Sequence, residues 1–331
     1  MAGMSKYLAN RLVQGFITLF IVTSLIFVLF DLMPGDPLDR FRANPLTPPE
    51  RLRELTHQYG LDKPYAERYG TFVWNMFTMQ FGQSWSENRP VIDILMERMP
   101  RTLLLFGVET LVVFALGIKI GSYIAWKRGG PVEGTTVVTS LVFYNMPSFW
   151  IGLISIWIFS FKLGLFPLSG FSGPDETVAM FHIPPDAFYF GFVDYLWHMM
   201  LPLAVLVAIG IAGVILLMRT SLLEVMGEDY ILTAKAKGLS ERLVRVRHAN
   251  RNAYLPIMTS FTISMALAVG GALILEQIFT YKGIGWTYLA ALLNQDQFLA
   301  GATLFILSVL VIGANILADI MYAWLDPRVR I

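Results

Sequence analysis

Six long apolar segments constrain the fold of this chain more than any other feature of its sequence. They cover residues 12–30, 102–126, 135–161, 195–218, 254–277 and 298–325. Each approaches or exceeds the ~20 apolar residues that cross a bilayer core, where lipid offers no partner to an unpaired backbone N–H or C=O group. Charged residues make up only 15% of the chain, against about 25% in soluble domains. We therefore expect an all-α membrane protein with six transmembrane helices.

Two of these predicted helices contain an internal proline. Pro147 lies in the third and Pro202 in the fourth, and we expect kinks there, since neighbouring groups in a bundle can satisfy the freed carbonyls. The first apolar segment follows basic residues, as in a signal peptide. It is longer than a typical signal and precedes the polar Met33-Pro34-Gly35-Asp36-Pro37 instead of a small-residue cleavage site. We expect a retained helix, with a removed signal as the alternative.

Lysine and arginine gather in the short loops on one side of the predicted membrane. That side, with the C-terminus, contains Lys127, Arg128, Arg219, Lys235, Lys237, Arg242, Arg245, Arg247, Arg251, Arg328 and Arg330. On the other side, Lys162 stands at a span end, and the segments 163–194 and 281–297 add only Lys282. Because short loops rich in Lys and Arg stay in the cytoplasm, we expect a multi-pass protein of the cell membrane with both termini cytoplasmic.

The predicted spans divide the chain into three parts. Residues 1–30 form the N-terminus and first span, residues 31–101 a small external domain, and residues 102–331 a five-helix core with a cytoplasmic loop at 219–253. Three helical stretches are expected in the external domain. The first begins at Thr47-Pro48-Pro49-Glu50 and can end at Gly60; the others cover 64–79 and 90–98. This domain is either a lid folded against the bundle or a docking surface for an external protein.

The cytoplasmic loop contains the strongest local signals. Asp229 can cap a short helix over residues 230–237, Gly238 can end it in a left-handed conformation, and Ser240 can cap the next helix. Thr233, Ala234 and Ala236 keep the first helix slender, so that a groove of another protein can close around it. The alternative is a basic helical hairpin that only fixes the topology.

This loop resembles the EAA-type loop of ABC importer permeases. The run Asp229-Tyr230-Ile231-Leu232-Thr233-Ala234-Lys235-Ala236-Lys237-Gly238-Leu239-Ser240 precedes Arg247-His248-Ala249-Asn250-Arg251-Asn252-Ala253 and Leu255-Pro256. This order is similar to that of the dipeptide/oligopeptide/nickel branch. Further matches occur at residues 33–37, 59–64, 97–103, 147–152, 276–279, 283–285 and 325–328, so the resemblance covers nearly the whole chain. Leu232 replaces the glutamate that names the broader motif, and the external loop 164–194 is longer than usual.

The resemblance implies a type I ABC importer permease, similar to the first of the branch's two permease subunits. It implies as partners a second homologous permease, two ABC ATPase subunits and an external substrate-binding protein, in the lipid bilayer. The short helix is then the element that docks into an ATPase, through Asp229, Tyr230, Thr233, Ala234, Ala236, Lys237, Gly238 and Leu239. The implied cargo is peptides or similar small solutes, with oligosaccharide or nickel uptake as alternatives. No cofactor is expected in this chain, since ATP and Mg belong to the ATPases.

Ionisable residues inside predicted spans are candidates for the translocation path, because placing them in lipid is costly. Glu109 and Glu276 either line the path or bond neighbouring helices. Tyr144, Asn145 and Pro147 combine polar groups with a predicted kink, and they either line the path or pack in the core. Lys119, His198 and Asp319 lie near span ends, where an anchoring role suffices.

Other classes of function find less support. The chain has no Gly-x-x-x-x-Gly-Lys-Ser/Thr phosphate loop and no recognisable catalytic set, so we expect no ATPase or other enzyme activity. It has no cysteine and only four scattered histidines, so we expect no metal site. With a net charge of +1, we expect no nucleic-acid partner. An autonomous secondary transporter stays open as a rival, although we find no internal repeat of the kind such folds use.

Overall fold

The computed structural model describes residues 2–32, 38, 42, 47–58, 61–268 and 273–325. The predicted motifs at 33–37, at Tyr59 and Gly60 and at 326–330 lie outside these residues. The described part is helical except for its loops and one small hairpin, in which β1 (Gln83–Ser84) pairs antiparallel with β2 (Arg89–Pro90). The all-α fold class is therefore confirmed.

Among the described residues, four helices are long and apolar enough to cross a membrane. They are α1 (Ala2–Asp31), α5 (Val91–Trp126), α9 (Phe190–Met226) and α15 (Gln297–Leu325). They coincide with the first, second, fourth and sixth predicted spans. Pro202 lies inside α9, which continues through it.

The third predicted span is wrong as a single helix. It consists of α6 (Pro131–Asn145), α7 (Ser148–Ser155) and the π-helix η1 (Ile156–Lys162), with a bend of 100° between α6 and the rest. Pro147 has no N–H to donate to the preceding turn, and it favours an extended backbone in the residue before it. Met146 has φ −74° and ψ 138°, which ends α6. If the bent pair counts as one span, the described residues contain five candidate spans.

The fifth predicted span is not described as one helix either. α11 (Glu241–Leu243) and the π-helix η2 (Val244–Ala249) lead into α12 (Asn250–Ala268), and α13 (Leu273–Ile278) follows beyond residues 269–272. Residues 269–272 are outside the described part. Six separate spans are therefore not confirmed, although the helices occupy the predicted segments.

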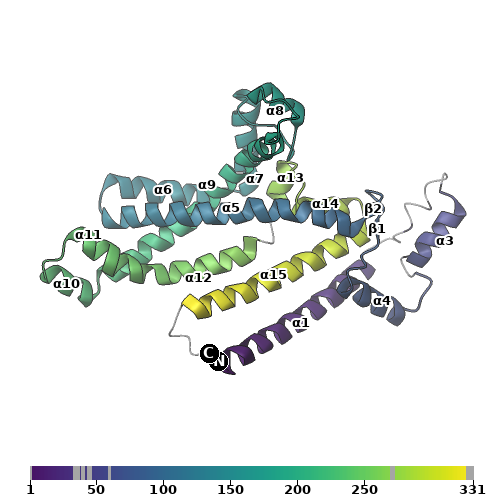
Figure 1. Ribbon diagram of the computed structural model, residues 1–331, viewed down its shortest axis with the longest axis horizontal. Helices are drawn as coiled ribbons and strands as arrows, with labels where there is room; N and C mark the ends of the chain where they lie inside the picture. Colours follow the sequence, from purple (N-terminus) through teal and green to yellow (C-terminus); the bar gives the residue numbers. More distant parts are fainter. Residues whose placement is uncertain are drawn as a thin grey trace.

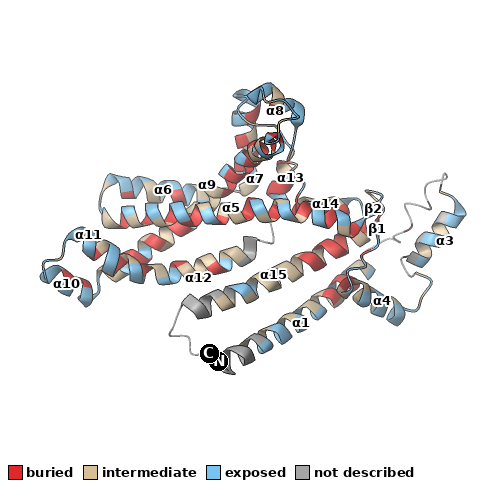
Figure 2. Ribbon diagram, in the orientation of Figure 1, coloured by how far each residue is buried: buried red, intermediate tan, exposed pale blue. Residues whose placement is uncertain are grey.

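The long helices lie along one axis, side by side, with shorter elements at both ends (Figure 1). α5 and α9 form the longest helix pair; α6 and α12 pack on α9, and α15 joins α12 to α1. α10 (Asp229–Ala236) and α11 lie at one end, called here the α10 end. α14 (Ile284–Leu293) and the β-hairpin lie at the opposite end, called here the α14 end. Buried residues concentrate where the long helices face one another (Figure 2).

The region predicted as an external domain contains α3 (Pro49–Gln58) and α4 (Tyr65–Phe77), close to two of the predicted helical stretches. The third stretch, 90–98, is the first part of α5, which includes Pro100 without a break. The hairpin β1–β2 was not predicted. The long loop before α9 contains one further helix, α8 (Pro174–Phe181), which projects sideways from the bundle (Figure 1).

A fully buried carboxylate fastens the hairpin to the bundle. Asp296 precedes α15, and its side chain accepts hydrogen bonds from Ser84 Oγ (2.6 Å), Ser86 N (3.1 Å), Ser86 Oγ (2.7 Å) and Leu299 N (3.1 Å). The carboxylate thus caps the N-terminus of α15 and at the same time satisfies three donors of the hairpin.

We expect Asp296→Ala to destabilise the protein by about 2–4 kcal/mol, because it removes a helix cap and leaves buried donors without partners. The midpoint of thermal unfolding in detergent should fall by about 5–10 °C. Asp186→Ala is the control, since Asp186 is exposed in the loop before α9, and it should leave the midpoint unchanged. Equal midpoints for both variants would contradict the anchoring role of Asp296.

Candidate functional site

The short helix predicted from the loop is present as α10. It follows α9 after Gly227 and Glu228, and Glu228 occupies the N-cap position without a side-chain hydrogen bond. The predicted cap, Asp229, is instead the first helical residue, where its negative charge still favours the positive end of the helix dipole. The expected terminator is confirmed, since Gly238 has φ +75° and its N–H donates to Lys235 O at 2.9 Å.

One face of α10 is buried inside this chain. Ile231 is 0% and Ala234 5% exposed, and both belong to one apolar cluster with Leu222 of α9 and with Val244 and Ala249 of η2. A hydrogen bond also ties α10 to α12, in which Asn252 Nδ2 donates to Tyr230 OH at 2.8 Å. The expectation that Ala234 faces a partner protein is therefore wrong. Its small side chain lets α10 lie close to η2.

The opposite face of α10 is open. Asp229, Leu232, Thr233 and Ala236 recur with the i, i+3, i+4, i+7 spacing of one helix face, and all four are exposed. Leu232 is 58% exposed, so an apolar side chain stands at the centre of this outer face. Lys235 and Lys237 are exposed beside it, and Leu239 is half-buried. This outer face is small and mostly uncharged, and the helix is fixed by the packing of its buried face against α9 and η2.

An ion pair joins α6 to α9 near the same end of the bundle. Glu133 accepts from Arg219 Nε at 2.6 Å and from Gly129 N at 2.6 Å, and it is buried. Arg219 was predicted only as a topological charge. The pair connects the start of α6 with the last turns of α9, directly before α10.

Glu276, a predicted path residue, is buried in the described structure. It is 1% exposed, and its carboxylate accepts from Thr102 Oγ1 at 2.8 Å and from Trp286 N at 2.8 Å. Thr102 Oγ1 in turn accepts from Ile284 N at 2.8 Å. The side chain thus joins α13 to α5 and to the start of α14. This geometry favours the structural alternative for Glu276 over the path.

Glu109 also lies between helices. It is half-buried on α5, accepts from Thr110 Oγ1 at 3.1 Å, and lies so close to Gly210 of α9 that a Cβ there would meet its Oε1 at 2.7 Å. Tyr144 and Asn145 are exposed at the end of α6, and Pro147 is exposed at the bend. The structure therefore does not bring the five predicted path residues into one site.

The residues expected to anchor span ends have defined surroundings. Arg11 of α1 makes a bidentate pair with Asp319 of α15, at 3.0 and 3.2 Å. Lys119 is exposed. His198 is buried, and its Nδ1 donates to the carbonyl O of Asp194 at 2.8 Å.

Besides Glu133 and Asp296, two more buried polar residues were missed from the sequence. Asp194 accepts from Ser172 Oγ, from Gly173 N at 3.1 Å and from Thr177 Oγ1 at 2.5 Å, and so fastens α8 to α9. Arg98 of α5 pairs with Glu87 at 2.7 Å and donates to Thr287 Oγ1 at 3.1 Å. The i, i+4 spacing of Asp194 and His198 at the start of a span was a usable signal for the first. The second lies in the matched stretch 97–103, but nothing in that stretch indicates its partners Glu87 and Thr287.

The comparisons with known proteins cover the whole length of the chain. Residues 117–331 match the family described as "Binding-protein-dependent transport system inner membrane component", and residues 4–106 match the N-terminal membrane component of the same systems. The oligopeptide transport system permease protein AppB of Bacillus subtilis is 33% identical over 328 residues, which are 99% of this chain and 100% of that protein. Two further relatives are the di/tripeptide transport system permease protein DppB of Pseudomonas aeruginosa, 33% identical, and the dipeptide transport system permease protein DppB of Escherichia coli K12, 32% identical. Each alignment covers 99% of this chain and 99% of the relative.

Both the family match and the full-length identity agree with the motif order of the loop that contains α10. The chain belongs to the family of binding-protein-dependent transport system inner membrane components, and it is a multi-pass permease subunit of an ABC importer.

Proposed function

We propose that this permease forms, with a second homologous permease, the path by which di- and oligopeptides enter the cell. The observation that carries the proposal is the end-to-end similarity to three permeases named for oligopeptide, di/tripeptide or dipeptide transport. An external binding protein delivers the peptide, and two ABC ATPase subunits bind ATP and Mg and supply the energy. Oligosaccharide or nickel uptake by the same machinery is the alternative that an uptake assay separates.

The geometry of α10 supports a role as the element that couples the ATPases to the bundle. Its outer face, built on Leu232, is free to enter a cleft of an ATPase. Its inner face, through Ile231 and Ala234, is packed against α9 and η2. A capped helix held in this way moves as a rigid body, so closure of the ATPases is transmitted to both helices. This arrangement requires the α10 end to be cytoplasmic and the α14 end external, in agreement with the Lys and Arg distribution.

The cargo is tested by uptake into proteoliposomes that contain the complete importer. We expect ATP-dependent accumulation of radiolabelled trialanine that is lost when this chain is omitted, since the permease forms half of the path. Maltotriose and Ni²⁺ under the same conditions are the controls. Accumulation of either control without any accumulation of trialanine would exclude the peptide proposal.

The coupling role predicts opposite consequences for two neighbouring alanines. Ala236→Trp adds volume on the outer face, so the variant should fold and insert normally but lose co-purification of the ATPases and peptide uptake. Ala234→Trp adds the same volume on the inner face, where overpacking costs about 1–3 kcal/mol, and should lower the thermal stability of the permease itself. Gly238→Val should also destabilise, because a left-handed conformation costs a non-glycine residue about 1–2 kcal/mol.

Arg242→Ala, on exposed α11, is the control for these variants and should change uptake little. If Ala236→Trp keeps full uptake and normal co-purification of the ATPases, the outer face of α10 does not dock, and the loop serves only as a topological anchor.

Orientation is testable because the chain contains no cysteine. Lys237→Cys at the α10 end should be protected in intact cells from a membrane-impermeant thiol reagent, and Asp186→Cys in the loop before α9 should be labelled. Both positions are exposed, so each should react once the membrane is permeabilised. The reverse labelling pattern in intact cells would overturn the proposed orientation.

A further inference from the structure

A groove runs along α9 between the α10 end and the bend after α6. It consists of two adjoining cavities of about 400 and 380 Å³. The first is lined by α5, α6 and α9, and the second by α6, α7, η1 and α9. Phe143 of α6 and Ala208 of α9 belong to both cavities, so the two form one continuous depression across much of the bundle.

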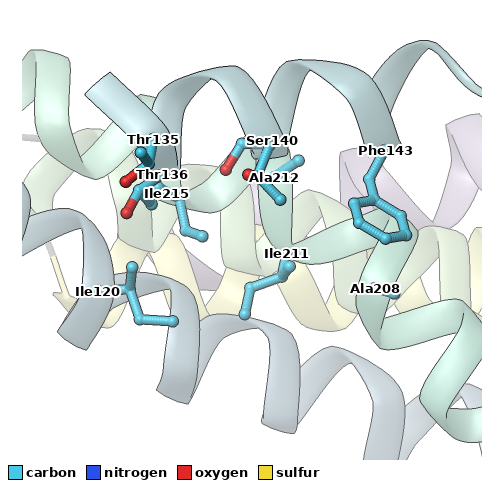
Figure 3. A pocket seen from close by; sticks show the side chains of 10 residues that line it. Ile120, Thr135, Thr136, Ser140, Phe143, Ala208, Ile211, Ala212 and Ile215 are labelled. Carbon is cyan, nitrogen blue, oxygen red and sulfur yellow. The ribbon is translucent and has the colours of Figure 1, made fainter. Parts of the chain in front are cut away.

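Hydroxyl groups line one side of the first cavity (Figure 3). Thr135, Thr136, Thr139 and Ser140 all come from α6, and the lining also includes Ile120 of α5 and Ile211 and Ile215 of α9. Thr135 Oγ1 donates to Pro131 O in the preceding turn at 2.9 Å, as other helical Ser and Thr residues of this chain do.

The other three hydroxyls are available to a ligand. In the part of the chain that the structure describes, the hydroxyls of Thr136, Thr139 and Ser140 have no protein partner. Ser140 is 6% exposed, Thr136 is half-buried and Thr139 is exposed, and all three side chains line the open cavity. A hydroxyl that leaves water without a hydrogen bond is costly, so three unpaired hydroxyls along one groove of a membrane-spanning bundle point to a molecule that visits it.

The lining also indicates the chemistry of that molecule. No acidic, basic or histidine side chain is among the residues that line either cavity. A hydroxyl both donates and accepts a hydrogen bond, as the backbone amides of a peptide require when they leave water. Uncharged walls do not select among the side chains of a peptide by charge. The second cavity, lined by Trp150, Ile154 and Phe159 among others, can take apolar side chains.

We propose that this groove is the wall that the subunit contributes to the transport path, and that Thr136, Thr139 and Ser140 hydrogen-bond the backbone amides of the passing peptide. This inference rests on the proposed function. Tyr144 and Asn145, at the end of α6, line neither cavity. Ala208 lines both cavities, so added volume there obstructs passage from one to the other.

Two adjacent residues of α6 provide a matched test in the complete importer in proteoliposomes. Thr139 lines the groove, whereas its neighbour Val138, 61% exposed, lines neither cavity. Thr139→Cys should react with a membrane-impermeant thiol reagent, and trialanine delivered by the binding protein should slow that reaction. Val138→Cys should react only with a lipid-soluble maleimide. Thr139→Val, of the same size, should lower trialanine uptake about fivefold, since one hydrogen bond is lost from the passing peptide.

Obstruction gives a second, independent readout. Ala208→Phe should abolish trialanine uptake while the ATPases still co-purify, and Val138→Phe, with added volume outside the groove, should leave uptake unchanged. If both Phe variants transport normally, the groove is not the path.

The thiol reactions can also overturn the inference while peptide uptake stays intact. If Thr139→Cys reacts only with the lipid-soluble reagent, the groove faces lipid. If it reacts with neither reagent, a helix of the second permease fills the groove. If it reacts with the aqueous reagent but trialanine does not slow the reaction, peptides do not pass the hydroxyls. Absence of trialanine uptake by the unmodified importer would instead contradict the proposed function, and the labelling pattern would still report whether the groove contains water.

Discussion

The close contact between α5 and α9 is the interaction on which the rest of the bundle depends. Gly117 and Gly121 of α5 lie against Val214, Ile215 and Met218 of α9, where an added Cβ would come within 2.7–2.8 Å of the neighbouring helix. Only glycine permits this approach, and small residues at helix interfaces are how membrane helices gain van der Waals contact without a hydrophobic driving force. Because α6, α7 and α12 all pack on α9, the groove and the seat of α10 are built on two parts of the same helix.

Buried carboxylates hold the α14 end together, and they explain why the path could not be identified from ionisable residues. Glu276, Asp194 and Asp296 are each 0–3% exposed, and each accepts several hydrogen bonds from segments distant in sequence or across a loop. A carboxylate in an apolar segment indicates that something important happens there. Whether it lines a path or joins loops depends on donors such as Thr102 and Ser84, which the local sequence does not identify. Hydroxyls have a lower cost in an apolar helix, so the residues that line the groove were not conspicuous.

The sequence predicted what depends on local chemistry and missed what depends on neighbours. Four spans, the short helix before Gly238 and the left-handed residue that ends it follow from hydropathy and backbone preference, and the structure agrees. Pro147 correctly marked a perturbation, but whether a proline kinks a helix or turns it by 100° is decided by the elements packed around it. Similarly, α5 continues through Pro100. The orientation of Ala234 was wrong because both faces of α10 contain small residues, and only the packing of η2 decides which one is buried.

The two ends of α9 connect the proposed coupling helix to the proposed path by direct contact. A rigid displacement of α10 acts on α9 through Ile231 and Leu222 and on α12 through η2, and α12 is packed on both α5 and α9. Arg219, one turn beyond Ile215, the last residue of α9 that lines the groove, holds Glu133 at the start of α6. If α9 moves while α6 stays in place, this ion pair is strained and the width of the first cavity changes, because α6 and α9 both line it. If the ion pair carries α6 along with α9, both helices move relative to Ile120 of α5, which also lines the cavity. The geometry thus requires no long-range mechanism, since the residues that respond to α10 are the ones that border the groove.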